Sequence, residues 1–313
     1  IARWCEDSRH LVAVRDDTRK LRDFWVINSL TKKPTLVTYK YEFPGDKHVT
    51  LNDLTVIDIK NRTCQKVNID KWNDQWVNFV HSTPDSKLVF FERTSRAWDK
   101  VDLISVNTST HEVKTIIHEE DKPFHDQHAK SISILNNGKD IIFRSERTGW
   151  AHFYHYDGNG KLLNAITSGN WVVGNIVAID TLKRTLYFYG YGKEKNINPH
   201  FYTLYKANID REGVTPLAVE DGQHTVNFFK SNRYFIDNYS KVNQVPTINV
   251  KDTNGRVVVK LAKPDISSLL DNGWTAPEPF SVKAADNRTD LYGVMYKPSN
   301  FDPKKKYPII SIV

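Results

Sequence analysis

The side chains that could do chemistry in this sequence are eleven histidines, scattered acidic pairs and many aromatic residues. Serine hydrolases of the α/β type carry the nucleophile in a Gly-x-Ser-x-Gly turn, because a sharp strand-to-helix turn accepts only small flanking residues. No two glycines of this sequence lie four positions apart, so that turn is absent from it. A histidine without a nucleophile has no general-base role to play. We therefore predict no catalytic residue within these 313 residues.

Metal and phosphate motifs are also missing from the sequence. His111-Glu112 and His118-Glu119-Glu120 lack the second histidine of a zinc-peptidase helix, and no glycine-rich phosphate loop occurs. Cys5 and Cys64 do not have the spacing of metal ligands, and the sequence alone does not say whether they pair. We expect no metal and no cofactor.

The charge balance does not indicate a nucleic-acid-binding protein. The net charge is +7, but the longest basic run, Lys304-Lys305-Lys306, is typical of a solvated turn before a strand. No run of about 18 apolar residues is present, so no transmembrane helix is predicted. The first residues, Ile1–Trp4, have no signal-peptide pattern and resemble the middle of a strand-and-turn unit. We expect further sequence before them, which would carry any targeting signal.

Short segments with alternating polarity recur along the chain, and none shows a sustained 3.6-residue period. The predicted strands are Leu11–Arg15, Leu54–Lys60, Lys87–Glu92, Asp102–Val106, Asp140–Ser145, His152–Tyr156, Thr185–Tyr189, Phe201–Ala207 and Thr247–Lys251. Tight turns recur every 42 to 53 residues, at 61–63, 107–109, 157–160, 210–213 and 252–255. A second set of turns alternates with them, at 84–87, 136–139, 180–183 and 230–233. A third repeated pattern is the pair Glu92-Arg93-Thr94 and Glu146-Arg147-Thr148.

A period of about 40–50 residues with four strands each is the signature of β-propeller blades. A single four-stranded blade cannot cover its own two faces, whereas stacked blades cover one another. The sequence therefore predicts an all-β fold with about five four-stranded blades over residues 1–277, an incomplete propeller. Residues 20–50, rich in Lys, Pro and aromatic residues, interrupt the repeat as a loop or hairpin excursion. One helical turn is expected at Pro264–Asn272, with Asp265 as the cap and Gly273 as the terminator.

The last part of the chain has a different pattern. Strand-like runs occur at Pro279–Ala284 and Leu291–Lys297, and a turn-rich stretch then leads into Tyr307–Val313. That final run is apolar, β-branched and without polar alternation, which is typical of a fully buried strand. We predict a domain boundary near residue 278, with residues 278–313 forming the first strands of an α/β domain.

The C-terminal run and two internal stretches together resemble the dipeptidyl peptidase IV branch of the prolyl-oligopeptidase family of serine peptidases. The internal stretches are Ser145–Tyr154, which reads Ser-Glu-Arg-Thr-Gly-Trp-Ala-His-Phe-Tyr, and Ile166–Val173, which reads Ile-Thr-Ser-Gly-Asn-Trp-Val-Val. This resemblance implies that residues 278–313 begin the α/β-hydrolase domain. It also implies that the catalytic groups follow Val313.

In that family the propeller caps a serine exopeptidase that cleaves short N-terminal peptides after proline or alanine. The resemblance implies that this region gates the substrate and anchors its free α-amine through a glutamate pair, which we expect before residue 1. Glu119-Glu120 is a local match to that pair, but we interpret it as a solvated acidic turn. The segment Phe124-His125-Asp126-Gln127-His128 stands where the family has a loop facing the central cavity. The functional interpretation is that Phe124 packs on the peptide while His125 and Asp126 orient the pocket; the alternative is a blade-edge loop with a capping aspartate.

The resemblance implies as partners peptide substrates with a free N-terminus and the protein's own C-terminal hydrolase domain, and it allows a homodimer. It implies a periplasmic or secreted protein, with no nucleic acid and no membrane span in this chain. In the family, excursions like residues 20–50 form subunit contacts or line the substrate entrance. Three alternatives stay open: a tripeptidyl or acylaminoacyl peptidase, a non-enzymatic propeller scaffold for proteins, and a glycan-binding propeller. The last would use exposed aromatic side chains such as Trp72, Trp76 and Trp98, although packing between blades is their commoner role.

Overall fold

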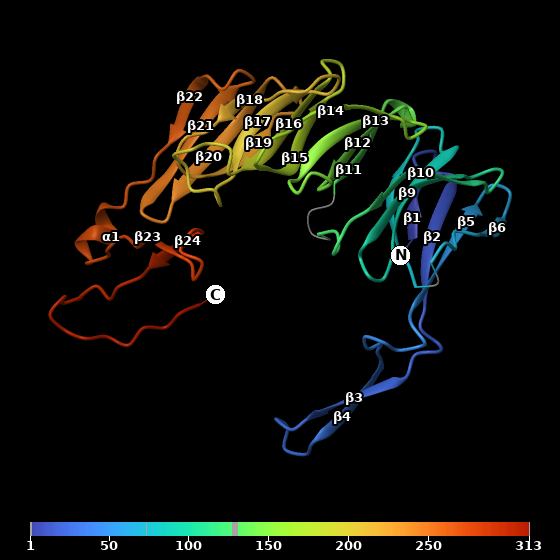
Figure 1. Ribbon diagram of the computed structural model, residues 1–313, viewed down its shortest axis with the longest axis horizontal. Coiled ribbons are helices and arrows are strands. Elements are labelled where there is room, and N and C mark those ends of the chain that lie inside the picture. The colour runs from blue at the N-terminus through green and yellow to red at the C-terminus, as the bar shows by residue number, and fades with distance from the viewer. Residues whose placement is uncertain (1, 73, 127–130, 313) are drawn as a thin grey trace. The chain divides into compact units, whose positions relative to one another are not determined.

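The computed structural model describes residues 2–72, 74–126 and 131–312, and antiparallel strands dominate it (Figure 1). Twenty of the strands described there form five four-stranded sheets, here called blades 1 to 5. Blade 1 contains β1 (Ala2–Trp4), β2 (His10–Asp17), β5 (Leu51–Asp58) and β6 (Thr63–Val67). Blade 2 contains β7 (Trp76–Ser82), β8 (Leu88–Thr94), β9 (Lys100–Asn107) and β10 (Val113–Glu120).

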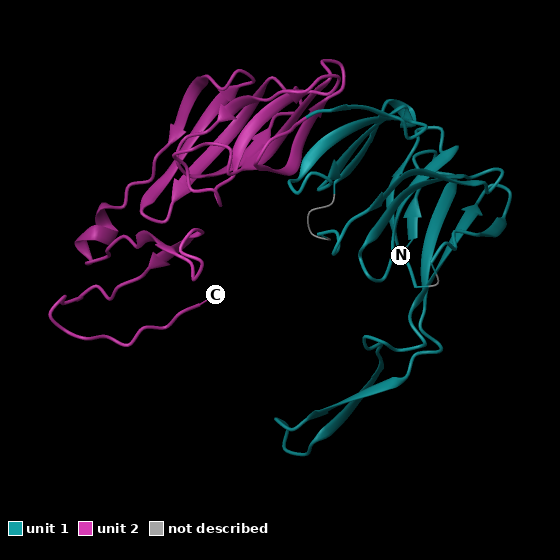
Figure 2. Cartoon of the chain, in the orientation of Figure 1, with its two compact units in different colours: residues 1–166 teal, residues 167–313 magenta. Residues whose placement is uncertain are grey.

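The remaining blades repeat this order. Blade 3 contains β11 (Ile132–Leu135), β12 (Asp140–Ser145), β13 (His152–Asp157) and β14 (Leu162–Ala165), with the 3-10 turn η1 (Asn136–Gly138) between its first two strands. Blade 4 contains β15 (Val172–Asp180), β16 (Thr185–Tyr191), β17 (Thr203–Asn208) and β18 (Thr215–Ala218). Blade 5 contains β19 (Gln223–Phe228), β20 (Tyr234–Lys241), β21 (Gln244–Asp252) and β22 (Val257–Ala262). The chain divides into two compact units, residues 1–166 with blades 1 to 3 and residues 167–313 with blades 4 and 5 (Figure 2).

The predicted turns fall at equivalent places in the blades. Each of the five recurring turns joins the third strand of a blade to the fourth, and each of the four alternating turns joins the first strand to the second. Asp and Asn side chains hold these turns by accepting hydrogen bonds from backbone N–H groups two to four residues later, as Asp157 does from Asn159 and Lys161. The four-strand repeat predicted from the sequence is confirmed.

Neighbouring blades within a unit bury apolar faces against each other. Successive side chains of β8 point to opposite faces of blade 2, so Phe91 packs with Val12 and Leu54 of blade 1. Phe90, the preceding residue, packs with Ile141 and Phe143 of blade 3. In the second unit, Tyr187 and Leu204 of blade 4 pack with Phe235 of blade 5. This two-sided burial is the reason that blades are stable as a stack and not alone.

The turn between β13 and β14 also packs on its neighbouring blade. Gly160 has a φ of +86°, and a Cβ atom there would lie 1.8 Å from the carbonyl oxygen of Ile116 in blade 2. Lys114 of blade 2 donates a hydrogen bond of 3.2 Å to the side-chain oxygen of Asn159. Glycine at this position thus permits both the turn and the contact between blades.

Residues 20–50 form the predicted excursion, a two-stranded hairpin of β3 (Asp23–Asn28) and β4 (Thr35–Lys40) between β2 and β5 (Figure 1). Its strands are almost wholly exposed, and Phe24, Tyr39, Tyr41 and Phe43 contact one another at its base. The predicted helical turn is α1 (Ser267–Asp271), where Asp265 accepts a hydrogen bond from the Ser267 N–H and Gly273 follows with a φ of +80°.

The C-terminal segment differs from the sequence prediction in one respect. The two predicted strand runs are present as the hairpin of β23 (Glu278–Lys283) and β24 (Asp290–Met295). The buried strand predicted at Tyr307–Val313 is wrong for the described residues 307–312, which form no strand; Ile309, Ile310 and Ile312 are 92%, 87% and 93% exposed. A strand needs a neighbour for its backbone hydrogen bonds, and no described strand pairs with this segment. Cys5 is buried, Cys64 is exposed, and the two are not bonded.

Candidate functional site

The loop that follows β10 carries the three residues that the sequence singled out. Backbone hydrogen bonds tie it to the β8–β9 turn, from Asp121 N to Asp99 O at 2.9 Å and from His125 N to Trp98 O at 2.7 Å. Phe124 projects outward with 61% of its surface exposed. His125 is buried, and Asp126 is exposed. This geometry presents one aromatic ring on a fixed loop.

His125 is a support of this loop. Its Nδ1 atom lies 2.6 Å from Asp121 Oδ2, so the two side chains span the loop from beginning to end. Only about a tenth of the His125 side chain is exposed. The contact between His125 and Asp121 therefore ties the end of the loop to its beginning. Gln127 and His128, the rest of the predicted segment, lie outside the described residues.

Glu119 is not the solvated turn residue that the sequence indicated, because β10 continues through Glu120. Glu119 lies two positions after the buried Ile117, on the same face, and is itself buried. Its Oε1 atom accepts a hydrogen bond from Ser145 and lies 3.1 Å from Arg147 Nη2, both in blade 3. Burial raises the pKa of Glu119. Glu120, on the opposite face, remains exposed as expected.

Arg147 belongs to the Ser-Glu-Arg-Thr-Gly-Trp stretch and links this cluster to aromatic rings. Its guanidinium lies 4.1 Å from the ring centre of Tyr154, and Nη2 donates a hydrogen bond of 2.6 Å to the hydroxyl of Tyr156. A guanidinium stacked on tyrosine and paired with a buried carboxylate is strongly fixed. This stretch therefore positions a side chain between blades 2 and 3.

A second charged network lies within blade 2, around the fully buried Asp102 of β9. Arg93 donates to Asp102 through Nε at 3.1 Å and Nη2 at 2.5 Å, and Lys71 donates at 3.0 Å. His118 Nδ1 lies 2.6 Å from the other carboxylate oxygen. Burial opposes ionisation of Asp102, but the hydrogen bonds from Arg93, His118 and Lys71 outweigh it and lower its pKa. Sequence analysis had not singled out this network.

The tryptophans proposed for glycan binding are partly engaged with other side chains. Trp76 stacks on Trp98, with ring centres 6.4 Å apart and planes inclined by 21°. Lys71 Nζ and Arg93 Cζ lie 4.9 and 5.5 Å from the ring centre of Trp72. Trp76 is the most exposed of the three.

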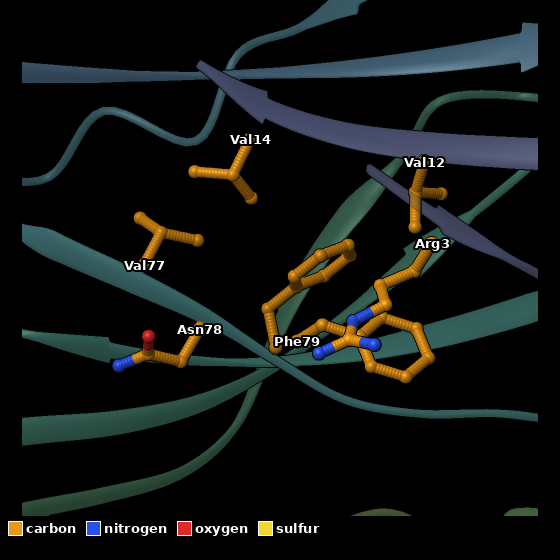
Figure 3. Close-up of a pocket in the computed structure, with 7 residues that line it drawn as sticks. Arg3, Val12, Val14, Val77, Asn78 and Phe79 are labelled. Atoms are coloured by element: carbon orange, nitrogen blue, oxygen red, sulfur yellow. The ribbon is translucent and has the colours of Figure 1, made fainter. Parts of the chain in front are cut away.

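A cavity of about 250 Å³ lies between blades 1 and 2. Its lining residues come from β1, β2, β7 and β8 and are mainly apolar, with Arg3 at one side (Figure 3). The lining holds no acid, thiol or histidine. A lining of this kind suits apolar packing between the two blades. Among the described residues, no helix is both long and apolar enough to cross a membrane.

The blades and their loops define a β-propeller with loop-borne aromatic and charged side chains, and comparisons with known proteins specify its family. The family described as "Dipeptidyl peptidase IV (DPP IV) N-terminal region" matches residues 1–246. The chain belongs to this family, as its sequence motifs indicated.

The chain is also similar in sequence to proteins that are named as dipeptidyl peptidases. The chain is 27% identical over 250 residues to dipeptidyl peptidase 4 of Trichophyton rubrum, covering 75% of this chain and 30% of that protein. It is 28% identical over 258 residues to human dipeptidyl peptidase 8, covering 75% of this chain and 27% of that protein. The chain thus spans less than a third of the length of these relatives.

The fold is also similar to that of a solved structure. The crystal structure of Porphyromonas gingivalis dipeptidyl peptidase 4 matches with a TM-score of 0.79 and 22% identity, over 97% of this chain and 43% of that one. The all-β propeller fold predicted from the repeat is confirmed.

Proposed function

We propose that this chain is the substrate-gating and N-terminus-anchoring propeller of a dipeptidyl-peptidase-IV-like serine exopeptidase, which removes short N-terminal peptides after proline or alanine. The observation that carries the proposal is the family match over residues 1–246, supported by the five four-stranded blades. The sequence contains no Gly-x-Ser-x-Gly turn, so the serine, the histidine that moves its proton and the aspartate that orients the histidine belong to another part of the protein.

In this proposal the propeller occupies residues 1–277 and the α/β-hydrolase domain begins at 278. The β23–β24 hairpin supports a separate packing partner, because its apolar side chains are exposed in this chain, among them Phe280, Val282, Leu291 and Val294. The partner is the protein's own hydrolase domain. The exposed apolar segment 307–312 becomes the next strand of that domain when neighbouring strands pair with it.

The loop of residues 121–126 is proposed to contact the peptide. Phe124 is accessible and stands on a loop held by hydrogen bonds and by the contact between Asp121 and His125, so its ring can pack on a substrate side chain at little cost in backbone entropy. His125 orients the loop through Asp121, and Asp126 orients the pocket. The fixed backbone hydrogen bonds to Trp98 and Asp99 support this role.

The β3–β4 hairpin is proposed to form a homodimer contact. Its exposed apolar side chains, such as Trp25, Ile27 and Leu36, form a surface of the kind that marks protein interfaces. Deleting residues 23–40 should convert a dimeric full-length protein to a monomer in light scattering. A secreted or periplasmic location completes the proposal.

The proposed activity is tested on the full-length protein with Ala-Pro and Gly-Pro chromogenic amides and their N-blocked forms. Anchoring of a free α-amine predicts hydrolysis of the free-amine substrates and none of the blocked ones. Hydrolysis of blocked substrates would indicate an acylaminoacyl peptidase or an endopeptidase. No hydrolysis of any of the four would leave a propeller scaffold.

A further inference from the structure

Four turns lie at one end of blades 4 and 5, in the second unit of the chain. They are the β15–β16 turn (residues 181–184), the β17–β18 turn (209–214), the β19–β20 turn (229–233) and the β21–β22 turn (253–256). We call them the basic turns. β22 begins at the last of these turns and runs away from it towards α1 (Figure 1). The C-terminal segment therefore leaves blade 5 from the opposite end.

Hydrogen bonds join the basic turns to one another. Within blade 4, Arg184 Nε donates to Asp210 Oδ2 at 2.8 Å, which links the two turns of that blade. Between the blades, the side-chain amide of Asn232 donates to Ile179 O at 3.2 Å. The ammonium group of a lysine in β17 donates to Thr253 O at 2.6 Å. The four turns thus form one surface across the two blades.

The basic turns contribute more than half of the net positive charge of the chain. They hold six basic and two acidic side chains, which makes +4 of the chain's net charge of +7. The equivalent turns of blades 2 and 3, residues 83–87, 108–112, 136–139 and 158–161, hold three basic and two acidic side chains. The excess of positive charge is therefore particular to blades 4 and 5.

The acidic side chains at this end of blades 4 and 5 are engaged. Asp210 pairs with Arg184, and Glu212 accepts a hydrogen bond from the Ser168 hydroxyl. The last residue of β15 and the last residue of β21 are aspartates, which accept hydrogen bonds from N–H groups of their own turns. Four basic side chains of the turns are exposed and form no ion pair with any described residue: Arg211, Lys230, Arg233 and Arg256.

The composition of the turns indicates the chemistry of the partner. Separate cations on several turns suit a linear polyanion, because each contact releases a counter-ion from the polymer. Most other residues of the turns are Thr, Ser, Asn and Gly, and their hydroxyl, amide and backbone groups can bond to sugar hydroxyls. A membrane surface calls for several exposed apolar side chains, and single-stranded nucleic acid calls for several aromatic ones. The turns hold one exposed side chain of each kind, Leu182 and Phe229.

We propose that the basic turns bind an anionic polysaccharide. The four unpaired basic side chains contact its anionic groups through charge-assisted hydrogen bonds, and the polar side chains between them contact its hydroxyl groups. The blades hold the turns in place, so the polymer meets a surface that is already arranged. This binding is separate from the proposed peptidase activity, and neither depends on the other.

The test measures binding of a heparin oligosaccharide to the full-length protein by isothermal titration calorimetry, at salt concentrations from about 50 to 200 mM. The variant Lys230→Ser/Arg233→Ser removes two charges from the basic turns. The matched control, Lys139→Ser/Lys161→Ser, removes two charges from exposed positions in the turns of blade 3. We expect the affinity of the first variant to fall about tenfold or more, and the slope of log Kd against log salt to fall by about one for each charge removed. The control should stay within about twofold of the wild type.

The proposal is overturned if the wild type does not bind heparin at physiological ionic strength. Equal losses in the two variants would also overturn it, because the attraction would then come from net charge alone. Tighter binding of single-stranded DNA or of phosphatidylserine vesicles than of heparin would overturn the assignment to a polysaccharide. Circular dichroism checks the fold of each variant, and Arg211→Ser/Arg256→Ser is a second pair with the same expected loss should the first pair misfold.

Discussion

Removing the charge of Asp102 tests whether the blade 2 network stabilises this fold. Asp102→Asn keeps the side-chain shape but leaves the guanidinium of Arg93, which is 5% exposed, without a counter-ion. Breaking one partner out of a buried ion pair costs about 3–5 kcal/mol. Lys71 and His118 remain accessible to water and add little to this loss. We therefore expect Asp102→Asn to lower the free energy of unfolding by about 3–5 kcal/mol.

The assay is urea denaturation followed by tryptophan fluorescence, since Trp72 lies against Arg93 and reports on this region. The matched control is Glu120→Gln, because Glu120 is exposed and lies 3.9 Å from Lys100; its loss should be about 0–1 kcal/mol. The double variant Arg93→Met/Asp102→Leu should regain most of the stability that Asp102→Asn loses, because no buried charge is then left unpaired. Equal stability of Asp102→Asn and Glu120→Gln would refute the reasoning.

Three further perturbations follow from particular residues. Gly160→Ala should lower the free energy of unfolding by about 2–4 kcal/mol, because its Cβ would overlap the Ile116 carbonyl. The control Gly149→Ala has φ +82° and open space around the new Cβ, so it should cost about 1 kcal/mol. Equal losses in thermal or urea unfolding would contradict the contact between blades. Burial opposes ionisation of Asp7, but hydrogen bonds from the N–H groups of His10 and Arg9 and from the His10 ring lower its pKa to about 2. The contribution of Asp7 to stability is therefore complete above about pH 4 and is lost as the pH falls towards 2. Asp7→Asn should flatten the dependence of the free energy of unfolding on pH in that window. An unchanged pH dependence would exclude this role. Phe124→Ala should lower kcat/KM of the full-length peptidase about tenfold, mainly through KM, because a ring buried on the substrate contributes roughly 1.5 kcal/mol. The control Leu182→Ala changes an exposed side chain in the β15–β16 turn and should leave the kinetics unchanged. Similar kinetics for the two variants would remove Phe124 from the substrate pocket.

The repeat and its turns could be predicted because they are local. Asp157-Gly158-Asn159-Gly160 specifies a tight turn through its own backbone and side chains, and the same holds for its counterparts in other blades. The β3–β4 excursion was also visible, since it breaks an otherwise regular spacing. Strand Asp140–Ser145 was predicted with the bounds that the structure has.

The charged networks could not be predicted, because their members are distant in sequence. Asp102 meets Lys71, Arg93 and His118 through strand register and blade packing, which no local pattern reveals. For Glu119 a signal did exist: it lies two residues after Ile117, so alternation places it on the buried face. Its partner Arg147 comes from the next blade, and without that partner a buried glutamate is not an obvious prediction.

The prediction of a buried strand was wrong for residues 307–312 for a related reason. An apolar β-branched run shows that a segment suits a buried strand, but the strand forms only when others flank it. Residues 307–312 have no such neighbour among the described residues. The pattern describes what this segment requires, and the requirement for neighbouring strands cannot be read from the segment itself.

The central proposal, that this propeller gates access by admitting free peptide N-termini and excluding folded proteins, is tested most directly by one kinetic comparison. The full-length protein is given a short peptide that begins Ala-Pro, and the same Ala-Pro sequence placed directly at the first strand of a stably folded domain. We expect release of Ala-Pro from the short peptide and none from the folded domain until that domain is unfolded. Equal rates of release from the short peptide and from the folded domain would contradict a gating role for this chain.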